Sequence, residues 1–134
     1  MAKPKANALP AELPGLRVTV DRVTFRPEAQ TPPDRPYCFA YFITIHNDSD
    51  RAVMIRGRKW VVRADDGEIT AVEGDGVVGQ TPLLNPGETF SYNSFHLLRT
   101  KTAVAEGAYL GLDGEGVAVL TRIPPFHMEV PGGD

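Results

Sequence analysis

Apolar and polar residues alternate with a period of two over most of the chain, the pattern of β-strands that bury one face. The clearest strand runs from Tyr37 to Asn47. One of its faces is wholly apolar or aromatic, with Tyr37, Phe39, Tyr41, Ile43 and Ile45. The other face is mixed, with Cys38, Ala40, Phe42, Thr44 and His46. Such a strand is expected at the centre of a sheet in a sandwich.

Further strands are predicted on both sides of this one. Val18 and Val20 alternate with polar residues, and Val23 and Phe25 resume one residue out of phase, as a β-bulge produces. The other predicted strands are residues 55–64, 68–72, 89–95, 108–112 and 117–123, with a short edge strand up to residue 130. Turn sequences separate them at residues 65–67, 85–88 and 113–116.

The fold class that follows is all-β. No window of 11 residues has a convincing helical period, and turn signals recur every 8 to 12 residues. We therefore predict an immunoglobulin or fibronectin type III-like antiparallel β-sandwich. Trp60 resembles the buried tryptophan of such sandwiches, and the single cysteine, Cys38, excludes the immunoglobulin disulfide. The fibronectin type III form is the closer comparison.

The chain of 134 residues is long enough for one domain with a core of its own. Prolines and a lack of apolar residues predict a flexible N-terminal tail over residues 1–15. The domain is expected over residues 16–130, followed by a short C-terminal tail over residues 131–134. Within it, residues 26–36 contain four prolines and are predicted to form a long loop.

Charge and hydropathy limit the partners. The net charge of −3, from 14 basic and 17 acidic residues, gives no support for nucleic-acid binding. No apolar run approaches the roughly 20 residues of a membrane span, and the N-terminus has no secretory h-region. A soluble cytoplasmic protein with no nucleic-acid or membrane partner is expected.

The segment Gly74-Asp75-Gly76-Val77-Val78-Gly79 contains a literal G-x-G-x-x-G. A dinucleotide site needs a helix directly after such glycines, with its N-terminus facing the pyrophosphate. Pro82 and Pro86 forbid that helix, and after Glu88 the next acidic residue is Glu106. A Walker loop is also excluded, because Gly79 is followed by Gln80.

Two interpretations of the glycines remain. In the structural one, they let the chain bulge and cross from one sheet to the other, with Val77 and Val78 packed inside. In the functional one, the amides of Gly74, Gly76 and Gly79 form an anion nest with Arg58. The neighbouring acids Glu73 and Asp75 oppose an anion there, whereas the basic residues Arg56, Arg58, Lys59 and Arg63 offset them if they fold nearby.

No catalytic or metal-binding constellation emerges. None of His46, His96 and His127 has a second ligand at metal-binding spacing, and each is interpreted as a surface or turn histidine. Ser91, Ser94 and Cys38 lie in no nucleophile motif. The acidic turns at Asp48, Asp50, Asp65 and Asp66 offer only weak sites for a hard cation. No catalytic residue, metal ligand or cofactor is therefore predicted.

Several short blocks together resemble the ApaG family in order and spacing, over roughly residues 16–130. The distinctive middle block is Gly74-x-Gly76-Val77-Val78-Gly79-x-x-Pro82-x-Leu84-x-Pro86-Gly87-x-x-Phe90-x-Tyr92-x-Ser94. It is flanked by Phe39-Ala40-Tyr41-x-Ile43-Thr44-Ile45-x-Asn47, Arg58-x-Trp60, Glu106-Gly107-x-Tyr109 and Ile123-Pro124-x-Phe126.

The resemblance implies a fibronectin type III-like sandwich. Bacterial members stand alone and are associated with cobalt and magnesium tolerance; similar eukaryotic domains, in F-box proteins and a DNA polymerase delta-interacting protein, look like protein-recognition modules. The chain departs from the family pattern at Lys59, Phe95 and Val104-Ala105. A histidine-dependent role beside the tryptophan therefore does not transfer, whereas Arg58, Trp60 and the glycines match position by position.

The expected function is that of a non-enzymatic ApaG-type binding module for another protein, linked to Co²⁺ and Mg²⁺ homeostasis. Arg56, Lys59 and Trp60 are the candidate partner-binding residues. The alternative is binding of an anion or nucleotide phosphate, with weak phosphoanhydride hydrolysis, at Gly74, Gly76, Gly79 and Arg58. A direct Co²⁺ or Mg²⁺ site is a third hypothesis, which the sequence supports poorly.

Overall fold

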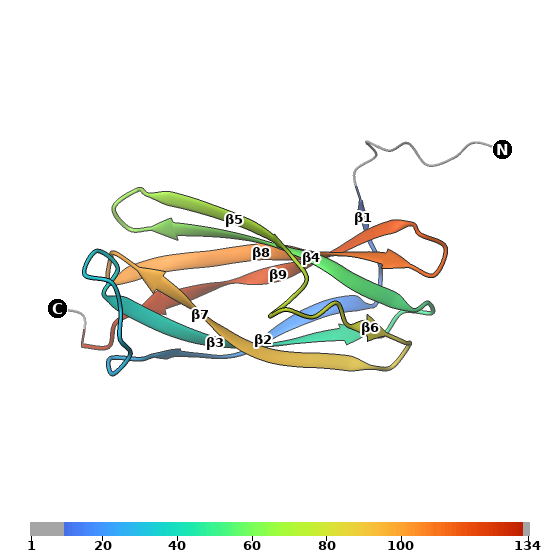
Figure 1. Ribbon diagram of the computed structural model, residues 1–134, viewed down its shortest axis with the longest axis horizontal. Coiled ribbons are helices and arrows are strands. Elements are labelled where there is room, and N and C mark those ends of the chain that lie inside the picture. The colour runs from blue at the N-terminus through green and yellow to red at the C-terminus, as the bar shows by residue number, and fades with distance from the viewer. Residues whose placement is uncertain (1–9, 133–134) are drawn as a thin grey trace.

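A computed structural model describes residues 10–132 as a sandwich of two β-sheets, with no helix in that range (Figure 1). The larger sheet has the order β1-β9-β8-β4-β5, and β6 pairs with β4 beside that path. The smaller sheet has the order β2-β3-β7. All pairs are antiparallel except β1 with β9. The predicted all-β antiparallel sandwich is confirmed.

The strands of the larger sheet are β1 (Ala11–Glu12), β4 (Val53–Ala64), β5 (Ile69–Asp75), β6 (Leu83–Leu84), β8 (Thr102–Asp113) and β9 (Ala118–Glu129). Those of the smaller sheet are β2 (Leu16–Phe25), β3 (Tyr37–Asn47) and β7 (Thr89–Leu98). As predicted, β3 is the central strand of its sheet, and the register of β2 shifts between Val20 and Arg22. The predicted turns contain Gly67, Gly87 and Gly116, each with positive φ.

Two strands are longer than the sequence pattern predicted. β8 begins at Thr102, and β9 continues through Pro124 and Pro125 to Glu129, where the sequence indicated an end. The register between β8 and β9 shifts between Ala105 and Gly107, opposite these prolines. A bulge leaves ladder positions unpaired, so proline is tolerated there although it lacks an amide hydrogen.

The sandwich also begins earlier than the predicted boundary at Leu16. Ala11 and Glu12 form β1 beside Val119 and Leu120 of β9. Leu13 is buried in the core, so residues 11–15 belong to the fold rather than to a tail. Residues 1–9 and 133–134, which complete the two predicted tails, lie outside the described residues.

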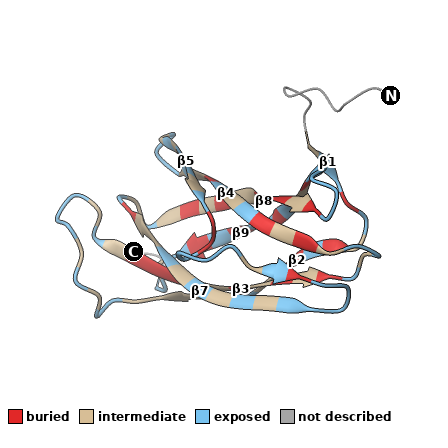
Figure 2. Ribbon diagram, turned by 45° about the vertical axis from the view of Figure 1, so that its right-hand side comes forward, coloured by how far each residue is buried: buried red, intermediate tan, exposed pale blue. Residues whose placement is uncertain are grey.

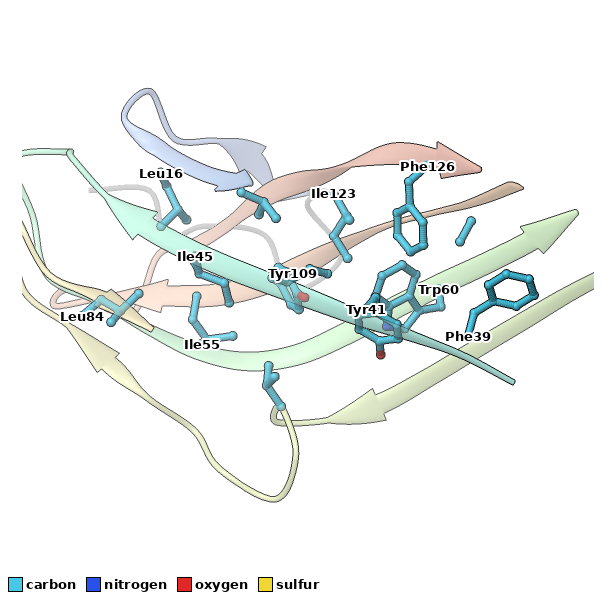
Figure 3. Close-up of a cluster of buried hydrophobic side chains, with 14 of the residues drawn as sticks. Leu16, Phe39, Tyr41, Ile45, Ile55, Trp60, Leu84, Tyr109, Ile123 and Phe126 are labelled. Carbon is cyan, nitrogen blue, oxygen red and sulfur yellow. The ribbon is translucent and has the colours of Figure 1, made fainter. Parts of the chain in front are cut away.

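The core lies between the two sheets and is aliphatic at one end and aromatic at the other (Figure 3). Leu16, Ile45, Ile55 and Leu84 gather at the aliphatic end, and Phe39, Tyr41, Trp60 and Phe126 at the aromatic end. Trp60 is 4% exposed, which confirms the predicted buried tryptophan. Between the two groups, Tyr109 is fully buried and its hydroxyl is hydrogen-bonded to that of Tyr92.

The two sheets differ in width, and this leaves one edge of the larger sheet uncovered. In Figures 1 and 2, β5 projects beyond the smaller sheet, with no strand facing it. The register places Val72 of β5 directly opposite Trp60 of β4, so both side chains lie on the inner face of the sheet. Trp60 is buried there, whereas Val72 is 48% exposed. The sandwich is therefore open along β5.

Candidate functional site: an open cleft between the two sheets

A cleft of about 430 Å³ occupies the open side of the sandwich, between β4 and β5 on one side and β7 on the other. Its walls include Tyr41, Arg58, Trp60, Val62, Ala64, Thr70, Val72, residues 94–98, and the charged residues Arg35, Glu68 and Arg99. The volume is within the range of ligand sites, and the lining is mostly apolar with a few polar groups, as in such sites. It is therefore the candidate site.

The two walls of the cleft differ in kind. From β4 and β5, the lining residues alternate along the strands, as do Thr70 and Val72, so the wall is the inner face of the sheet. From β7, five consecutive residues, 94–98, line the cleft. Consecutive residues point to opposite faces of a strand, so this wall is the edge of β7 rather than one of its faces.

Aromatic rings form the base of the cleft. His96 stacks on Tyr41 with 4.8 Å between the ring centroids, and Trp60 meets the His96 ring edge-on at 4.7 Å. Phe126 packs against Trp60 from β9 at 5.8 Å. Such contacts hold the rings in fixed relative orientations, beyond the burial of their apolar area.

Two nitrogens in this ring cluster have no hydrogen-bond partner. Both Trp60 Nε1 and His96 Nε2 are enclosed and unpaired. Leaving a buried polar atom unpaired costs about 1–3 kcal/mol, so native proteins rarely retain two side by side. The cluster is therefore less than optimal for stability alone, which is a common property of binding sites.

His96 is an interior residue, and its interpretation as a surface or turn histidine was wrong. It is half-buried in β7, with its ring packed against those of Tyr41 and Phe126. The sequence contained evidence for this position: His96 is separated from Phe90 and Tyr92 by an even number of positions along β7, so it lies on the same inward face. Desolvation by burial lowers the pKa of His96 from 6.5 to about 4.

This shift makes the stability of the fold depend on pH. A histidine whose pKa is depressed by folding binds its proton more readily in the unfolded chain, so its neutral form stabilises the fold above pH 6.5 and stability falls as pH drops towards 4. We expect about 2 kcal/mol less free energy of unfolding at pH 5 than at pH 8. Urea denaturation at several pH values measures this.

The variant His96→Gln is expected to flatten the profile between pH 8 and pH 5. The carboxylates with lowered pKa values, Asp21, Asp66 and Asp113, start from 3.8 and lose their stabilising effect only at lower pH. A variant with His127→Gln, an exposed histidine, serves as control. If the free energy of unfolding of His96→Gln fell with pH as steeply as that of the wild type, His96 would not be the cause of the pH dependence.

Charged side chains close one end of the cleft. Glu68, next to the β4–β5 turn, accepts a hydrogen bond from Arg35 at 3.2 Å and lies 3.5 Å from Arg99. Arg99 also pairs with Asp66. Arg35 comes from the loop before β3 and Arg99 from the turn after β7, so this network joins the two sheets at the end of the cleft.

Arg58 lies farther along the same wall. Its Nη1 donates to the backbone carbonyls of Asp75 at 2.8 Å and Gly76 at 3.1 Å. The guanidinium lies against Gly74, where an added Cβ would be 2.7 Å from Nη2. No carboxylate among residues 10–132 lies within 4 Å of it, so its charge is not neutralised by an ion pair.

The glycine segment turns the chain back along its own sheet. Gly74 belongs to β5, and after Gly79 the chain enters β6, which pairs with β4 of the larger sheet. The crossing to the smaller sheet comes later, through residues 85–88, so the predicted crossing at the glycines was wrong. Val77 is fully buried as predicted, but Val78 is 47% exposed with a φ of 44°. A tight turn at Val77–Gln80 forces consecutive side chains to opposite sides.

Gly76 is the glycine that this turn requires. Its φ is +65°, and an added Cβ would lie 2.5 Å from the carbonyl oxygen of Gln80. Gly76→Val is expected to lower the free energy of unfolding by about 2 kcal/mol, since backbone strain and a clash add together. Chemical denaturation measures this loss.

Gly79→Ala is the matched control. Gly79 also has positive φ, +78°, but no atom lies within 4 Å of a Cβ added there. Its substitution should therefore cost only the strain, about 1 kcal/mol. Equal losses for both variants would exclude the close contact with Gln80 as the cause.

One amide of the proposed anion nest, and two amides beside it, already have partners. The amide of Gly76 donates to Arg56 O, and the amides of Val77 and Gln80 donate to each other's carbonyls. The structure does bring Arg58 to the glycines, but it meets their carbonyls. Anion binding there stays a prediction.

The predicted partner-binding residues separate. Trp60 lies at the base of the cleft, whereas Lys59 points to the outer face of β4 and lies 3.8 Å from Glu73. Arg56 is exposed and lines a shallow outer groove with Glu73 and Asp75. Alternation explains the position of Lys59, because it lies between Arg58 and Trp60 of the inner face. Arg56 has the parity of these two residues, but the register shift between Ile55 and Gly57 displaces it.

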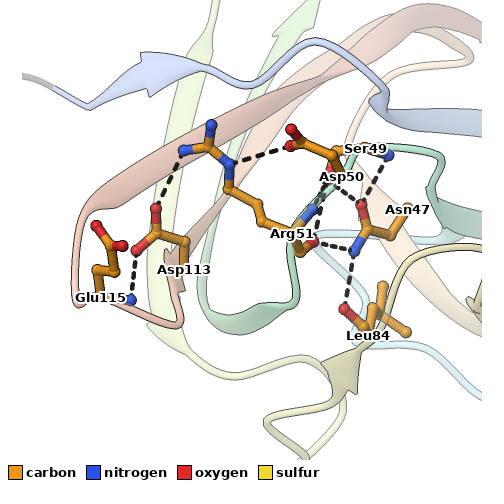
Figure 4. Close-up of polar contacts among 7 residues, drawn as sticks. All are labelled: Asn47, Ser49, Asp50, Arg51, Leu84, Asp113 and Glu115. Carbon is orange, nitrogen blue, oxygen red and sulfur yellow. Dashed lines mark hydrogen bonds and ion pairs between the residues drawn. The ribbon is translucent and has the colours of Figure 1, made fainter.

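Among the described residues, no group of three or more histidine, cysteine or acidic side chains is placed to hold a metal ion. In the β8–β9 turn, the Asp113 carboxylate accepts from the amide of Glu115 and pairs with Arg51 (Figure 4). It also accepts from the amide of Val117, so its role in this turn is structural. In residues 10–132 no helix has the length and apolar character to cross a membrane.

Comparisons with known proteins agree with this fold and these motifs. The model of the ApaG domain matches residues 27–112. Protein ApaG of Anaeromyxobacter dehalogenans is 42% identical over 88% of this chain and 92% of its own length, and Protein ApaG of Vibrio cholerae is 36% identical over 89% and 94%. A crystal structure from Bordetella pertussis, described as a putative ApaA protein, superimposes with a TM-score of 0.80 at 32% identity, over 92% of this chain and 99% of that one. The chain therefore belongs to the ApaG family.

Proposed function

We propose that the protein is a non-enzymatic binding module whose cytoplasmic partner is another protein, bound in the cleft between β4–β5 and β7. The observation that carries this proposal is the exposure of an inner face of the sandwich. Val72 is 48% exposed although it lies beside the buried Trp60. An apolar inner face that the fold leaves uncovered is typical of a surface covered by a partner.

The surroundings of the cleft support a protein rather than a small molecule as partner. Phe95 of β7 is 58% exposed and Val72 of β5 is 48% exposed, on opposite walls of the cleft. Aromatic and aliphatic side chains around a buried tryptophan resemble the apolar centre of a protein interface, with arginines at its border. A small ligand would leave these outer side chains in water.

Photo-crosslinking in the native host tests this proposal. A photoreactive amino acid is placed at Val72, at Phe95 and, as control, at Leu110, an exposed apolar residue of β8 next to the buried Tyr109. We expect Val72 and Phe95 to crosslink to the same protein and Leu110 not to crosslink to it. Crosslinks of equal yield from all three positions, or none from Val72 and Phe95, would contradict the proposal.

We further propose that the link to Co²⁺ and Mg²⁺ homeostasis acts through this partner. A strain lacking the gene should become sensitive to Co²⁺, and the wild-type protein should restore tolerance. Val72→Lys places a charge in the exposed part of the cleft and should fail to restore it, whereas Leu110→Lys should succeed. If Val72→Lys restored Co²⁺ tolerance at the same protein level as the wild type, the cation phenotype would not depend on the cleft.

The alternative, binding of an anion or nucleotide phosphate, is favoured by one observation. Arg58 carries a charge without a carboxylate within 4 Å in the described chain, and it lies beside Gly74. Calorimetry with pyrophosphate and ATP, with and without Mg²⁺, tests it. Heat that disappears in Arg58→Gln would support it, and absence of heat at about 1 mM ligand would end it.

A further inference from the structure

The smaller sheet lacks one strand relative to the face it covers. It has three strands, β2-β3-β7, against the five-strand path of the larger sheet. β2 packs on β9 at one side of the sandwich, and β7 is the edge strand at the other. Beyond β7, the inner face of β5 has no opposing strand (Figures 1 and 2). A fourth strand beside β7 would lie over this inner face.

We propose that the partner supplies this strand: an extended, acidic segment that pairs with the free edge of β7 and places apolar side chains over Val72. This inference rests on the proposed function and names the chemistry of the partner. The edge of β7 itself lines the cleft over five consecutive residues, 94–98. A strand added there has its inward side chains directed to β4–β5, because alternate residues of an added strand share one face.

The backbone of β7 is available for pairing. β7 pairs with β3 over the ten positions from Thr89 to Leu98, and within residues 10–132 it has no partner on its other side. An edge of this length presents a row of unpaired amides and carbonyls. Proteins that must stay monomeric protect such edges with prolines or charges, and β7 contains neither. Its edge is therefore suited to strand addition.

The charge of the cleft determines the kind of segment. The chain has a net charge of −3, yet the cleft lining contains three arginines and one acidic residue, Glu68. Arg35 and Arg99 share Glu68, and Arg99 also pairs with Asp66, whereas Arg58 has only backbone carbonyls as partners. A carboxylate from the partner would meet an unneutralised guanidinium at Arg58, so an acidic segment is favoured over a basic one.

The fluorescence of Trp60 reports binding directly, because it is the only tryptophan of the chain. The probe is an acetylated peptide of about nine residues in which valine or phenylalanine alternates with glutamate, long enough to match β7. We expect a saturable change in Trp60 emission. A peptide with lysine in place of glutamate should bind about tenfold more weakly, because the lining is positive. The peptide can be methylated on either of its two alternating sets of backbone nitrogens. Methylation should abolish binding when it blocks the set of amides that faces β7, and should not when it blocks the other set.

Two variants and a hydrogen-exchange experiment locate the peptide. Arg58→Gln should weaken binding of the acidic peptide about tenfold. Arg63→Gln, which removes an exposed arginine from the outer face of β4, should leave it unchanged. Amides along β7 should gain protection from exchange when the peptide binds, whereas those of β5 should not.

Several outcomes would overturn the inference. They are no change in Trp60 emission at about 1 mM acidic peptide, equal binding of the lysine peptide, or protection along β5 instead of β7. If Val72 and Phe95 still crosslink to one protein in cells while the peptide fails, strand addition is refuted and the binding module stands. If the crosslinks also fail, the proposed function falls with it. If the protein formed a dimer through β7 in the absence of peptide, the strand beside β7 would come from a second copy of this chain. The proposal of an acidic partner segment would then be wrong.

Discussion

Gly107→Ala is expected to destabilise the protein by about 4 kcal/mol, a large part of the stability of a domain of this size. Gly107 lies in β8, between Trp60 of β4 and Ile123 of β9. A Cβ at this position would lie 2.0 Å from the carbonyl oxygen of Lys59 and 3.3 Å from Ile123 Cδ1. The oxygen belongs to the backbone of a neighbouring strand in the same sheet, so it cannot move without separating β4 from β8. Chemical denaturation measures the loss.

Gly114→Ala is the matched control for this prediction. Gly114 lies in the turn between β8 and β9, and no atom lies within 4 Å of an added Cβ. The substitution should be close to neutral, because alanine there also restricts the unfolded chain. If Gly107→Ala lost no more stability than Gly114→Ala, β4 and β8 would have to be farther apart at Gly107 than the structure places them.

The sequence predicts the fold well wherever a local pattern decides it. Alternation from Tyr37 to Asn47 identifies the central strand, and the phase shift after Val20 identifies a bulge. The prediction from sequence fails where pairing with a strand distant in the sequence decides the structure. Pro124 and Pro125 end a strand by their own chemistry, and β9 continues only because the two prolines form a bulge opposite Glu106 of β8. That bulge is a property of the pair of strands.

The candidate site was only partly predictable for a similar reason. Trp60 and Arg58 share a parity along β4, and both line the cleft. The edge of β7 and the exposed Val72 were missed, because nothing local shows that the smaller sheet ends one strand short of β5. Strand count and sheet order are set by long-range pairing, which alternation along one strand does not encode.

Asn47 links three segments at the opposite end of the sandwich (Figure 4). It is fully buried, and its Nδ2 donates to the carbonyls of Arg51 at 2.9 Å and Leu84 at 2.8 Å. Its Oδ1 accepts from the amide of Ser49 at 3.1 Å and from the hydroxyl of the same residue at 2.6 Å. The side chain thus fixes the β3–β4 turn and ties it to β6, the short strand that follows the glycine segment.

Asn47→Ala should therefore lower the free energy of unfolding by about 3 kcal/mol. The Leu84 carbonyl would lose its donor while still buried beside Asn47, and an unpaired buried carbonyl costs more than the bond it replaces. Because β6 leads directly into the crossing to β7, hydrogen exchange should accelerate at Leu83 and Leu84 before it does in β3. Asn93→Ala, in an exposed position of β7, should change stability by less than about 0.5 kcal/mol. Equal losses in the two variants would mean that the turn holds β6 in place without the Asn47 side chain.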